Sequence, residues 1–234
     1  MPDSRNRPWE MIAAALESST RAASLALIVE GQILTQDLTG SRAHASDMVP
    51  CLAQLCQQAG VHPRQLEVLV LGLGPGSFTG LRVATATALG LARGNGAQLV
   101  GLPSHETMAW NYLESAAQHS EVMVLQDARG GALQYSHYRQ ANELPEVLCP
   151  PTRILIEEAA ESLPRGIPLL TDAAGLLAAG LEGDEETEVV GGIKPEAASL
   201  LQLGLKHLQR NGPTAPEDLR PLYLAAFTPK MRAR

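Results

Sequence analysis

Short apolar runs and polar turns alternate through the first half of the chain. Three such runs separated by two polar turns predict an antiparallel meander. A segment with apolar residues at helical spacing follows, and after it come an apolar run, a glycine-rich loop, an alanine-rich stretch and a last apolar run. The expected elements are strands at 11–16, 22–29, 32–38, 66–71 and 98–102, and helices at 44–59 and 83–92.

The second half repeats this order of patterns, although no residue-level repeat is visible. Expected strands lie at 121–126, 133–138, 143–148, 167–170 and 188–190, and expected helices at 156–163, 172–180 and 195–209. The pattern therefore predicts an α/β protein with two topologically similar halves. The expected boundary separates residues 1–103 from residues 104–234, with Ser104 as a helix cap and with the last helix and tail packing back.

The stretch from Leu71 to Arg82 links an apolar run to the alanine-rich segment, which is the order strand, tight loop, helix. Gly74 and Gly76 flank a proline, so a sharp turn with positive φ is open to the backbone there. Ser77 or Thr79 can cap the new helix by accepting a hydrogen bond from a backbone N–H. Phe78 would be an apolar side chain at the tip of the turn, which needs either a core slot or a partner.

Neither standard nucleotide motif fits this loop. It has no Gly-Lys-Ser/Thr ending, and it has no Gly-x-Gly-x-x-Gly followed by a suitably spaced acid. By spacing alone, a tight turn with close helix–strand packing is a simpler interpretation than a phosphate site, although helix N-termini do bind phosphates. Ser77 does not fit the Gly-x-Ser-x-Gly nucleophile motif either.

Composition narrows the possible functions. Hydrophobic residues make up 45% and aromatic residues only 3%, which predicts an aliphatic core. A net charge of −7 argues against autonomous binding to a nucleic-acid backbone, which requires a basic surface. Three cysteines indicate reduced thiols rather than a disulfide framework. Residues 1–10 lack the apolar region of a signal peptide and no run is long enough to span a membrane, so we expect a cytoplasmic protein without a membrane partner.

The nine residues from Gly74 to Arg82, Gly-Pro-Gly-Ser-Phe-Thr-Gly-Leu-Arg, closely resemble the signature of the TsaB (YeaZ) family. The turn Asp127-Ala128-Arg129 and the segment around Tyr223 also resemble that family. The resemblance implies an actin-like, sugar-kinase-like ATPase fold of the ribonuclease H-like kind. It also implies a non-catalytic accessory subunit that binds and positions TsaD, in the complex that adds threonylcarbamoyl to adenosine next to the tRNA anticodon.

The same resemblance implies further partners. A TsaE-like ATPase would join in a nucleotide-dependent way, tRNA would be reached only through the complex, and the chain could also form a homodimer. The chain would have no cofactor of its own, and ATP or ADP with Mg²⁺ would act at the level of the complex. Two enzyme hypotheses stay open beside this one: an actin-fold ATPase or small-molecule kinase, and a metallopeptidase-like hydrolase.

Glu17 and Asp127 are the weak candidates for cofactor binding. Glu17 occupies the position of the Asp with which ATPases of this fold bind phosphates through Mg²⁺, and its extra methylene would displace the carboxylate. Ordinary turn chemistry explains Asp127 equally well. Catalytic relatives of this fold bind a metal with two histidines four residues apart on the helix after the third strand. Here His44 is followed by Met48 at that spacing, so no metal site is predicted.

With only weak candidates for cofactor binding and no metal site predicted, the sequence favours a surface that binds another protein. The two helices around the signature are expected to form it, because the family uses this pair to bind its partner or a second copy. Packing of the second helix between the sheet and a neighbour inside one domain is the alternative. The residues predicted for the partner interface are Ser77, Phe78, Thr79, Leu81, Arg82, Thr85, Ala88, Leu89, His44, Met48 and Leu52.

Overall fold

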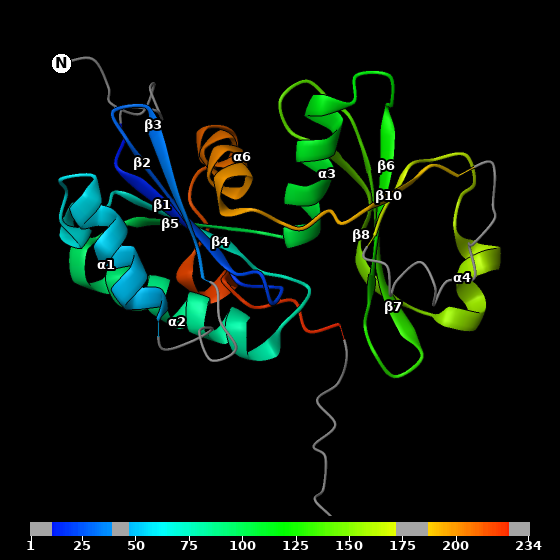
Figure 1. Ribbon diagram of the computed structural model, residues 1–234, viewed down its shortest axis with the longest axis horizontal. Helices are drawn as coiled ribbons and strands as arrows, with labels where there is room; N and C mark the ends of the chain where they lie inside the picture. Colours follow the sequence, from blue (N-terminus) through cyan, green and yellow to red (C-terminus); the bar gives the residue numbers. More distant parts are fainter. Residues whose placement is uncertain (1–10, 39–46, 172–186, 225–234) are drawn as a thin grey trace, which may run out of the picture.

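The computed structural model describes residues 11–38, 47–171 and 187–224, and these form two lobes, each built on one five-stranded sheet (Figure 1). The first sheet has the order β3-β2-β1-β4-β5 and the second the order β10-β9-β6-β7-β8. In each lobe three consecutive strands form an antiparallel meander, and two later strands add in parallel beside its first strand. The predicted repetition of one topology in the two halves is therefore confirmed.

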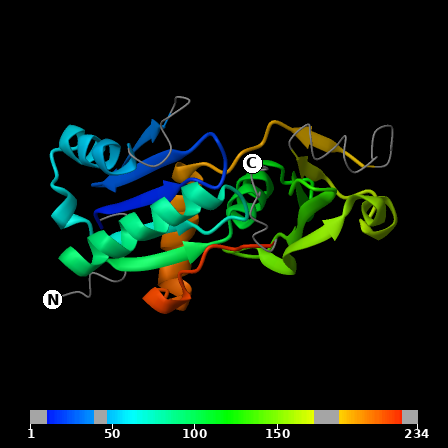
Figure 2. The same cartoon turned by 90° about the horizontal axis from the view of Figure 1, so that it is seen from below.

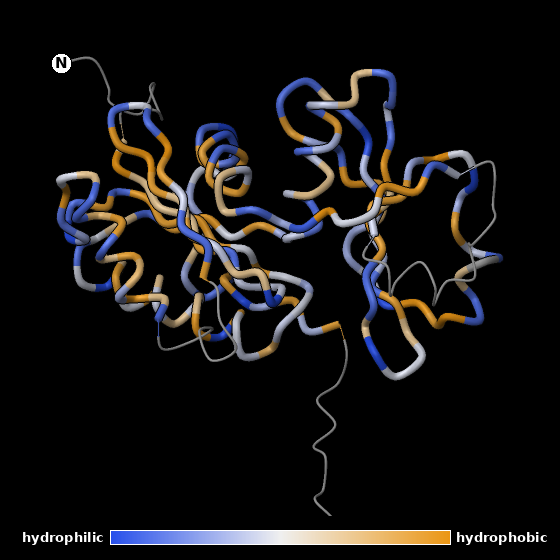
Figure 3. The backbone as a smooth tube through the Cα atoms, viewed as in Figure 1, coloured by the Kyte–Doolittle hydropathy of each residue, from blue (hydrophilic) through white to orange (hydrophobic). Residues whose placement is uncertain are grey.

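The strands follow the apolar runs of the sequence. Those of the first sheet are β1 (Ala13–Glu17), β2 (Ser24–Val29), β3 (Gln32–Asp37), β4 (Val68–Gly72) and β5 (Gln98–Leu102). Those of the second are β6 (Glu121–Asp127), β7 (Ala132–Arg139), β8 (Glu146–Leu155), β9 (Leu169–Thr171) and β10 (Val189–Gly191). Hydrophobic residues concentrate along the central strands of both lobes, as Figure 3 shows.

Helices cover both faces of the first sheet. Helices α1 (Met48–Gln58) and α2 (Phe78–Asn95) pack on one face, and α6 (Ala197–Asn211) packs on the other. The side chains of β1 divide between these two cores at alternate positions, as the pleat of a strand requires. Both faces are thus buried, which explains why the inner strands read as continuous apolar runs.

The second sheet is covered in the same way. Helix α3 (Ser104–Ser115) packs on β6 and β7, and α4 (Ile156–Ser162) packs on the opposite face. Helix α3 also contacts α6, where the Nε2 atom of His207 lies 2.7 Å from an oxygen of Glu106. Helix α3 therefore stands between the two lobes and contacts elements of both.

The chain beyond α6 returns along the first lobe (Figure 2). The backbone N–H of Thr214 donates to the carbonyl of Leu99 at 2.7 Å, and the N–H of Gly101 donates to the Thr214 hydroxyl at 3.1 Å. The short helices η3 (Pro63–Gln65) and η4 (Pro216–Asp218) complete the described elements. Helix α6 and the described chain after it thus pack on the first lobe.

Several predicted boundaries were wrong. The alanine-rich stretch 83–92 is only part of helix α2, which begins at Phe78 because Ser77 caps it, as the sequence allowed. Ser104 is a helical residue and not a cap, since Pro103 holds the cap position. Strand β8 extends to Leu155, well beyond the expected end at residue 148. The helix expected at 172–180 lies outside the described residues.

Two glycines inside helices give a matched test of the packing. A Cβ atom at Gly204 of α6 would lie 2.3 Å from Cγ1 of Val70, whereas a Cβ at Gly90 of α2 would have no atom within 4 Å. We expect Gly204→Ala to lower the free energy of unfolding by about 1–3 kcal/mol through overpacking. We expect Gly90→Ala to raise it by roughly 0.5–1 kcal/mol through helix propensity. Urea denaturation measures both, and equal effects would contradict the packing of α6 on β4.

Candidate functional site

The signature loop connects the end of β4 to the start of α2. Gly74 and Gly76 have φ angles of +88° and +151°, so both need the conformational freedom of glycine, as predicted. The hydroxyl of Ser77 accepts a hydrogen bond from the N–H of Gly80 at 3.3 Å, which confirms Ser77 as the helix cap. The loop therefore sets the position of the α2 N-terminus.

The loop packs directly on the turn between β1 and β2. The N–H of Ser77 donates to the Ser19 carbonyl at 2.6 Å. A Cβ atom at Gly76 would lie 2.1 Å from the Ser19 carbonyl oxygen, and a Cβ at Gly80 would lie 2.3 Å from that of Ser18. Both glycines are thus required by close approach of backbone to backbone. The signature loop thus packs directly on the backbone of the first turn.

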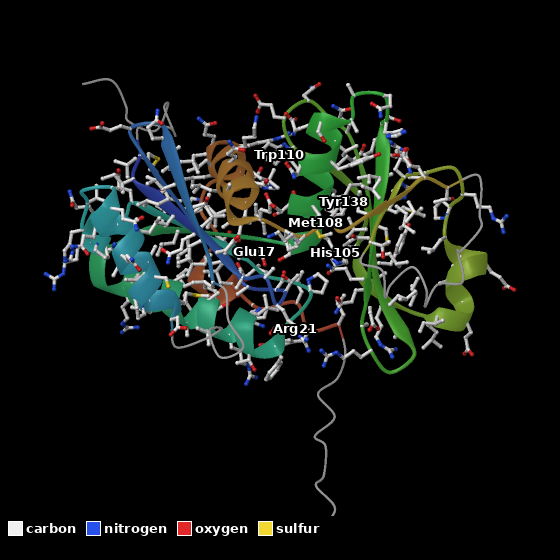
Figure 4. The ribbon with its side chains drawn as sticks, viewed as in Figure 1. Glu17, Arg21, His105, Met108, Trp110 and Tyr138 are labelled. Carbon is white, nitrogen blue, oxygen red and sulfur yellow. The ribbon has the colours of Figure 1, made fainter. Side chains whose placement is uncertain are left out.

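Glu17, at the end of β1, points into the interior of the protein and is fully buried (Figure 4). One carboxylate oxygen accepts from the N–H of Ser19 at 2.7 Å, and the other accepts from the Ser104 hydroxyl at 2.9 Å. The same hydroxyl accepts from the N–H of Gly74 at 3.2 Å. Glu17 thus joins the first turn, the signature loop and α3.

Burial raises the pKa of Glu17, while its hydrogen bonds to Ser19 and Ser104 act against that rise. A carboxyl whose folded pKa is raised stabilises the fold fully below its unfolded pKa of 4.5. That contribution is lost as the pH rises through the folded pKa. The buried carboxyl of Glu17 is therefore suited to a structural role and not to binding a solvated metal ion.

A cleft of about 560 Å³ lies between the first turn, the signature loop and the β6–β7 hairpin. Arg21 and Arg129 are the cations along it, and Asp127 is its one carboxylate. One oxygen of Asp127 accepts from the N–H of Arg129 at 2.7 Å, which is ordinary turn chemistry. The full lining is Ser19, Thr20, Arg21, Gly76, Ser77, Phe78, Thr79, Gln126, Asp127, Ala128, Arg129 and Gln134.

These residues do not fit the Mg²⁺–phosphate site that the fold class implies. That site needs a carboxylate from the first turn, and Glu17 is instead bonded to Ser19 and Ser104 inside the protein. It also needs the backbone of the first turn to be open to a phosphate, and the backbone at Gly76 and Gly80 instead packs directly on Ser19 and Ser18. Asp127 is the one carboxylate in the lining of the cleft.

His105, which the sequence analysis did not single out, is fully buried in α3 beside this cleft (Figure 4). One ring nitrogen lies 2.8 Å from the Ser136 hydroxyl, and the other lies 3.0 Å from the side-chain oxygen of Gln126, which lines the cleft. Burial lowers the pKa of His105 from 6.5 to about 4, against the opposing effect of the Gln126 hydrogen bond. The imidazole is therefore neutral at physiological pH.

Phe78 does not stand alone at the tip of the loop. Its ring centroid lies 5.0 Å from that of Tyr223 in the C-terminal tail, and the Arg82 guanidinium lies 3.8 Å from the Phe78 centroid. The Nε–H of Arg82 donates to the Tyr223 hydroxyl at 3.1 Å. Phe78 thus packs on a residue of its own chain that lies 145 positions later in the sequence.

The structure corrects part of the predicted partner interface. Helical periodicity showed which residues of α1 and α2 share a face, but not which face packs on the sheet. Several of the residues predicted for the interface lie on the face that packs on the sheet. The buried residues are Met48, Leu52, Leu81, Thr85 and Ala88, which therefore have no surface to offer a partner. Those at the surface are Ser77, Phe78, Thr79, Arg82 and Leu89, of which Phe78 and Leu89 are half-buried.

Three further observations concern metals and membranes. His44 lies outside the described residues. Among the described residues, no group of three His, Cys, Asp or Glu side chains is placed to hold a metal ion. No helix in the described part of the chain is both long and apolar enough to cross a membrane.

The repeated topology and the cleft between paired hairpins define an actin-like, sugar-kinase-like fold, and the solved structure of YeaZ from Pseudomonas aeruginosa has the same fold. That structure aligns with a TM-score of 0.79 at 23% identity, covering 92% of this chain and 100% of that chain. The model of the TsaD family, described as tRNA N6-adenosine threonylcarbamoyltransferase, matches residues 33–172. The chain belongs to this family.

Curated relatives confirm the TsaB (YeaZ) assignment made from the signature. The tRNA threonylcarbamoyladenosine biosynthesis protein TsaB of Haemophilus influenzae is 32% identical over 122 residues, which are 52% of this chain and 51% of that protein. TsaB of Escherichia coli is 29% identical over 126 residues, which are 54% of each chain. The chain thus spans about half the length of the curated relatives it matches.

Proposed function

We propose that this chain is the non-catalytic accessory subunit of a complex that makes threonylcarbamoyladenosine on tRNA, and that it binds and positions a TsaD-like catalytic subunit. The observation that carries the proposal is the combination of the TsaD family match with relatives named tRNA threonylcarbamoyladenosine biosynthesis protein TsaB. The absence of its own catalytic role is part of the proposal, and the inward carboxylate of Glu17 supports it.

The docking surface would be the outward side of α1 and α2, which lie side by side on one face of the first sheet (Figure 1). Val49 of α1 is 52% exposed, the largest exposure among the big apolar side chains described. On α2, Ala86 and Gly90 are exposed, and such small side chains let another helix approach closely. The same surface would serve a homodimer when no partner is present.

The other partners follow from this role. A TsaE-like ATPase would join the pair, and ATP or ADP with Mg²⁺ would act in the complex rather than in the cleft of this chain. The acidic net charge of −7 supports a role in which tRNA is held through the complex. The proposal keeps the cytoplasmic location expected from the sequence.

Mixing the purified full chain with the TsaD-like protein of the same organism tests the proposal. We expect light scattering after size exclusion to give the mass of a one-to-one complex. Calorimetry with MgATP on the isolated chain provides the control, and we expect no binding there. Two separate peaks at micromolar concentration, or stoichiometric MgATP binding by the chain alone, would contradict the proposed function.

A further inference from the structure

The C-terminal segment 213–224 is held on the first lobe by a series of specific contacts. Thr214 bonds to the outer edge of β5 through its N–H and its hydroxyl. Leu219 is 3% exposed and occupies the space that a Cβ atom at Gly101 would need. The N–H of Leu222 donates to the Leu73 carbonyl at 2.8 Å, immediately before the signature loop. We call this segment the strap.

The strap places one aromatic ring at the start of α2. Tyr223 follows Leu222 directly, so the bond from Leu222 to Leu73 fixes where its ring lies. The ring packs on Phe78, and the hydroxyl accepts a hydrogen bond from Arg82. Tyr223 is nevertheless 45% exposed, so much of its ring faces outward.

Arg82 is held from two sides in this cluster. Phe78 lies under the guanidinium plane at 3.8 Å, and Tyr223 binds its Nε–H at 3.1 Å. Among the described residues no carboxylate forms an ion pair with Arg82, and its side chain is exposed. A guanidinium fixed in this way keeps its two terminal amino groups for a bidentate contact, and a carboxylate is the group whose shape and charge match them.

We propose that Tyr223 is a positioning residue of the docking surface, which holds Arg82 so that its guanidinium binds a carboxylate of the TsaD-like partner. The inference rests on the proposed function and adds the chemistry of one contact to it. The cluster lies at the N-terminal end of α2 and so continues the exposed side of that helix. Each arginine rotamer fixed before docking reduces the entropy lost on binding.

The test measures the dissociation constant of the complex with the full-length TsaD-like protein at several salt concentrations. We expect Arg82→Gln to weaken binding about tenfold and to make the dissociation constant less dependent on salt. Arg82→Lys keeps the charge but loses the planar pair of N–H donors that matches a carboxylate. We therefore expect it to bind clearly more weakly than the wild type. Arg64→Gln removes another exposed arginine, from η3, and should leave binding and its salt dependence unchanged.

Tyr223→Phe keeps the ring but removes the acceptor for Arg82. We expect it to weaken binding about threefold in the wild-type background and not at all in the Arg82→Gln background. A merely structural role of the strap would give the same loss in both backgrounds. If the wild type binds but Arg82→Gln behaves as Arg64→Gln does, or if the two losses add, this inference is overturned and the proposed function stands. If the wild type itself does not bind, both are overturned.

Discussion

Ala86→Glu is expected to weaken binding of the TsaD-like partner by about 100-fold or more, because it would bury an unpaired carboxylate in the docking surface. Ala86 lies in the middle of α2 and is exposed in the isolated chain, so the same change should leave the fold intact. Glutamate is also a good helix former, which removes propensity as a cause of any loss. Analytical size exclusion and calorimetry with the partner measure the effect.

Gln202→Glu is the matched control for that experiment. It adds the same negative charge at an exposed position of a long helix, but on α6, which covers the opposite face of the first sheet. We expect the control to bind as the wild type does and both variants to unfold at similar urea concentrations. Equal affinity of Ala86→Glu and Gln202→Glu would place the partner elsewhere than on α2.

The free energy of unfolding is expected to fall by about 3 kcal/mol through His105 alone as the pH drops from 6.5 to 4. The pKa of this buried histidine is lowered from 6.5 to about 4, so over that interval the unfolded chain binds a proton that the folded chain does not. The contribution of His105 to stability therefore rises with pH across the interval and levels off above 6.5, whereas the raised pKa of Glu17 acts in the opposite direction. Protonation would also force the Ser136 hydroxyl to accept from the imidazole instead of donating to it, whereas the Gln126 oxygen accepts from either form.

Urea denaturation at a series of pH values measures this contribution as a difference between variants. Glu121, whose pKa is lowered mainly by its hydrogen bond with Arg139, adds an acid-sensitive contribution of its own, so the wild-type curve alone is not enough. We expect His105→Gln to lose most of the slope between pH 4 and 6.5, whereas His62→Gln, at an exposed position of the surface, should keep it. Parallel curves for wild type and His105→Gln would show that His105 is not the titrating group.

The sequence alone determined the strands, the repeated order of the two halves and the turn of the signature loop. These are local features: apolar runs bounded by turn residues make buried strands, and Gly74, Gly76 and Ser77 each act through their own backbone or their next neighbours. The unusual composition of the loop also identified the family. The end of β8 was less accurate, because the apolar pattern ends at residue 148 whereas the strand continues to Leu155.

Only the tertiary structure decided which residues of the helices and turns are accessible. Whether Leu81 and Ala88 face a sheet or a partner depends on how α2 rotates onto β4, and the helical period alone does not determine that rotation. Glu17 points inward because Ser104, distant in sequence, supplies a hydroxyl next to it. Likewise Phe78 meets Tyr223, and His105 meets Gln126, because the strap and α3 bring distant segments together. Contacts between distant segments leave no periodic trace along the chain, whereas strands, turns and caps do.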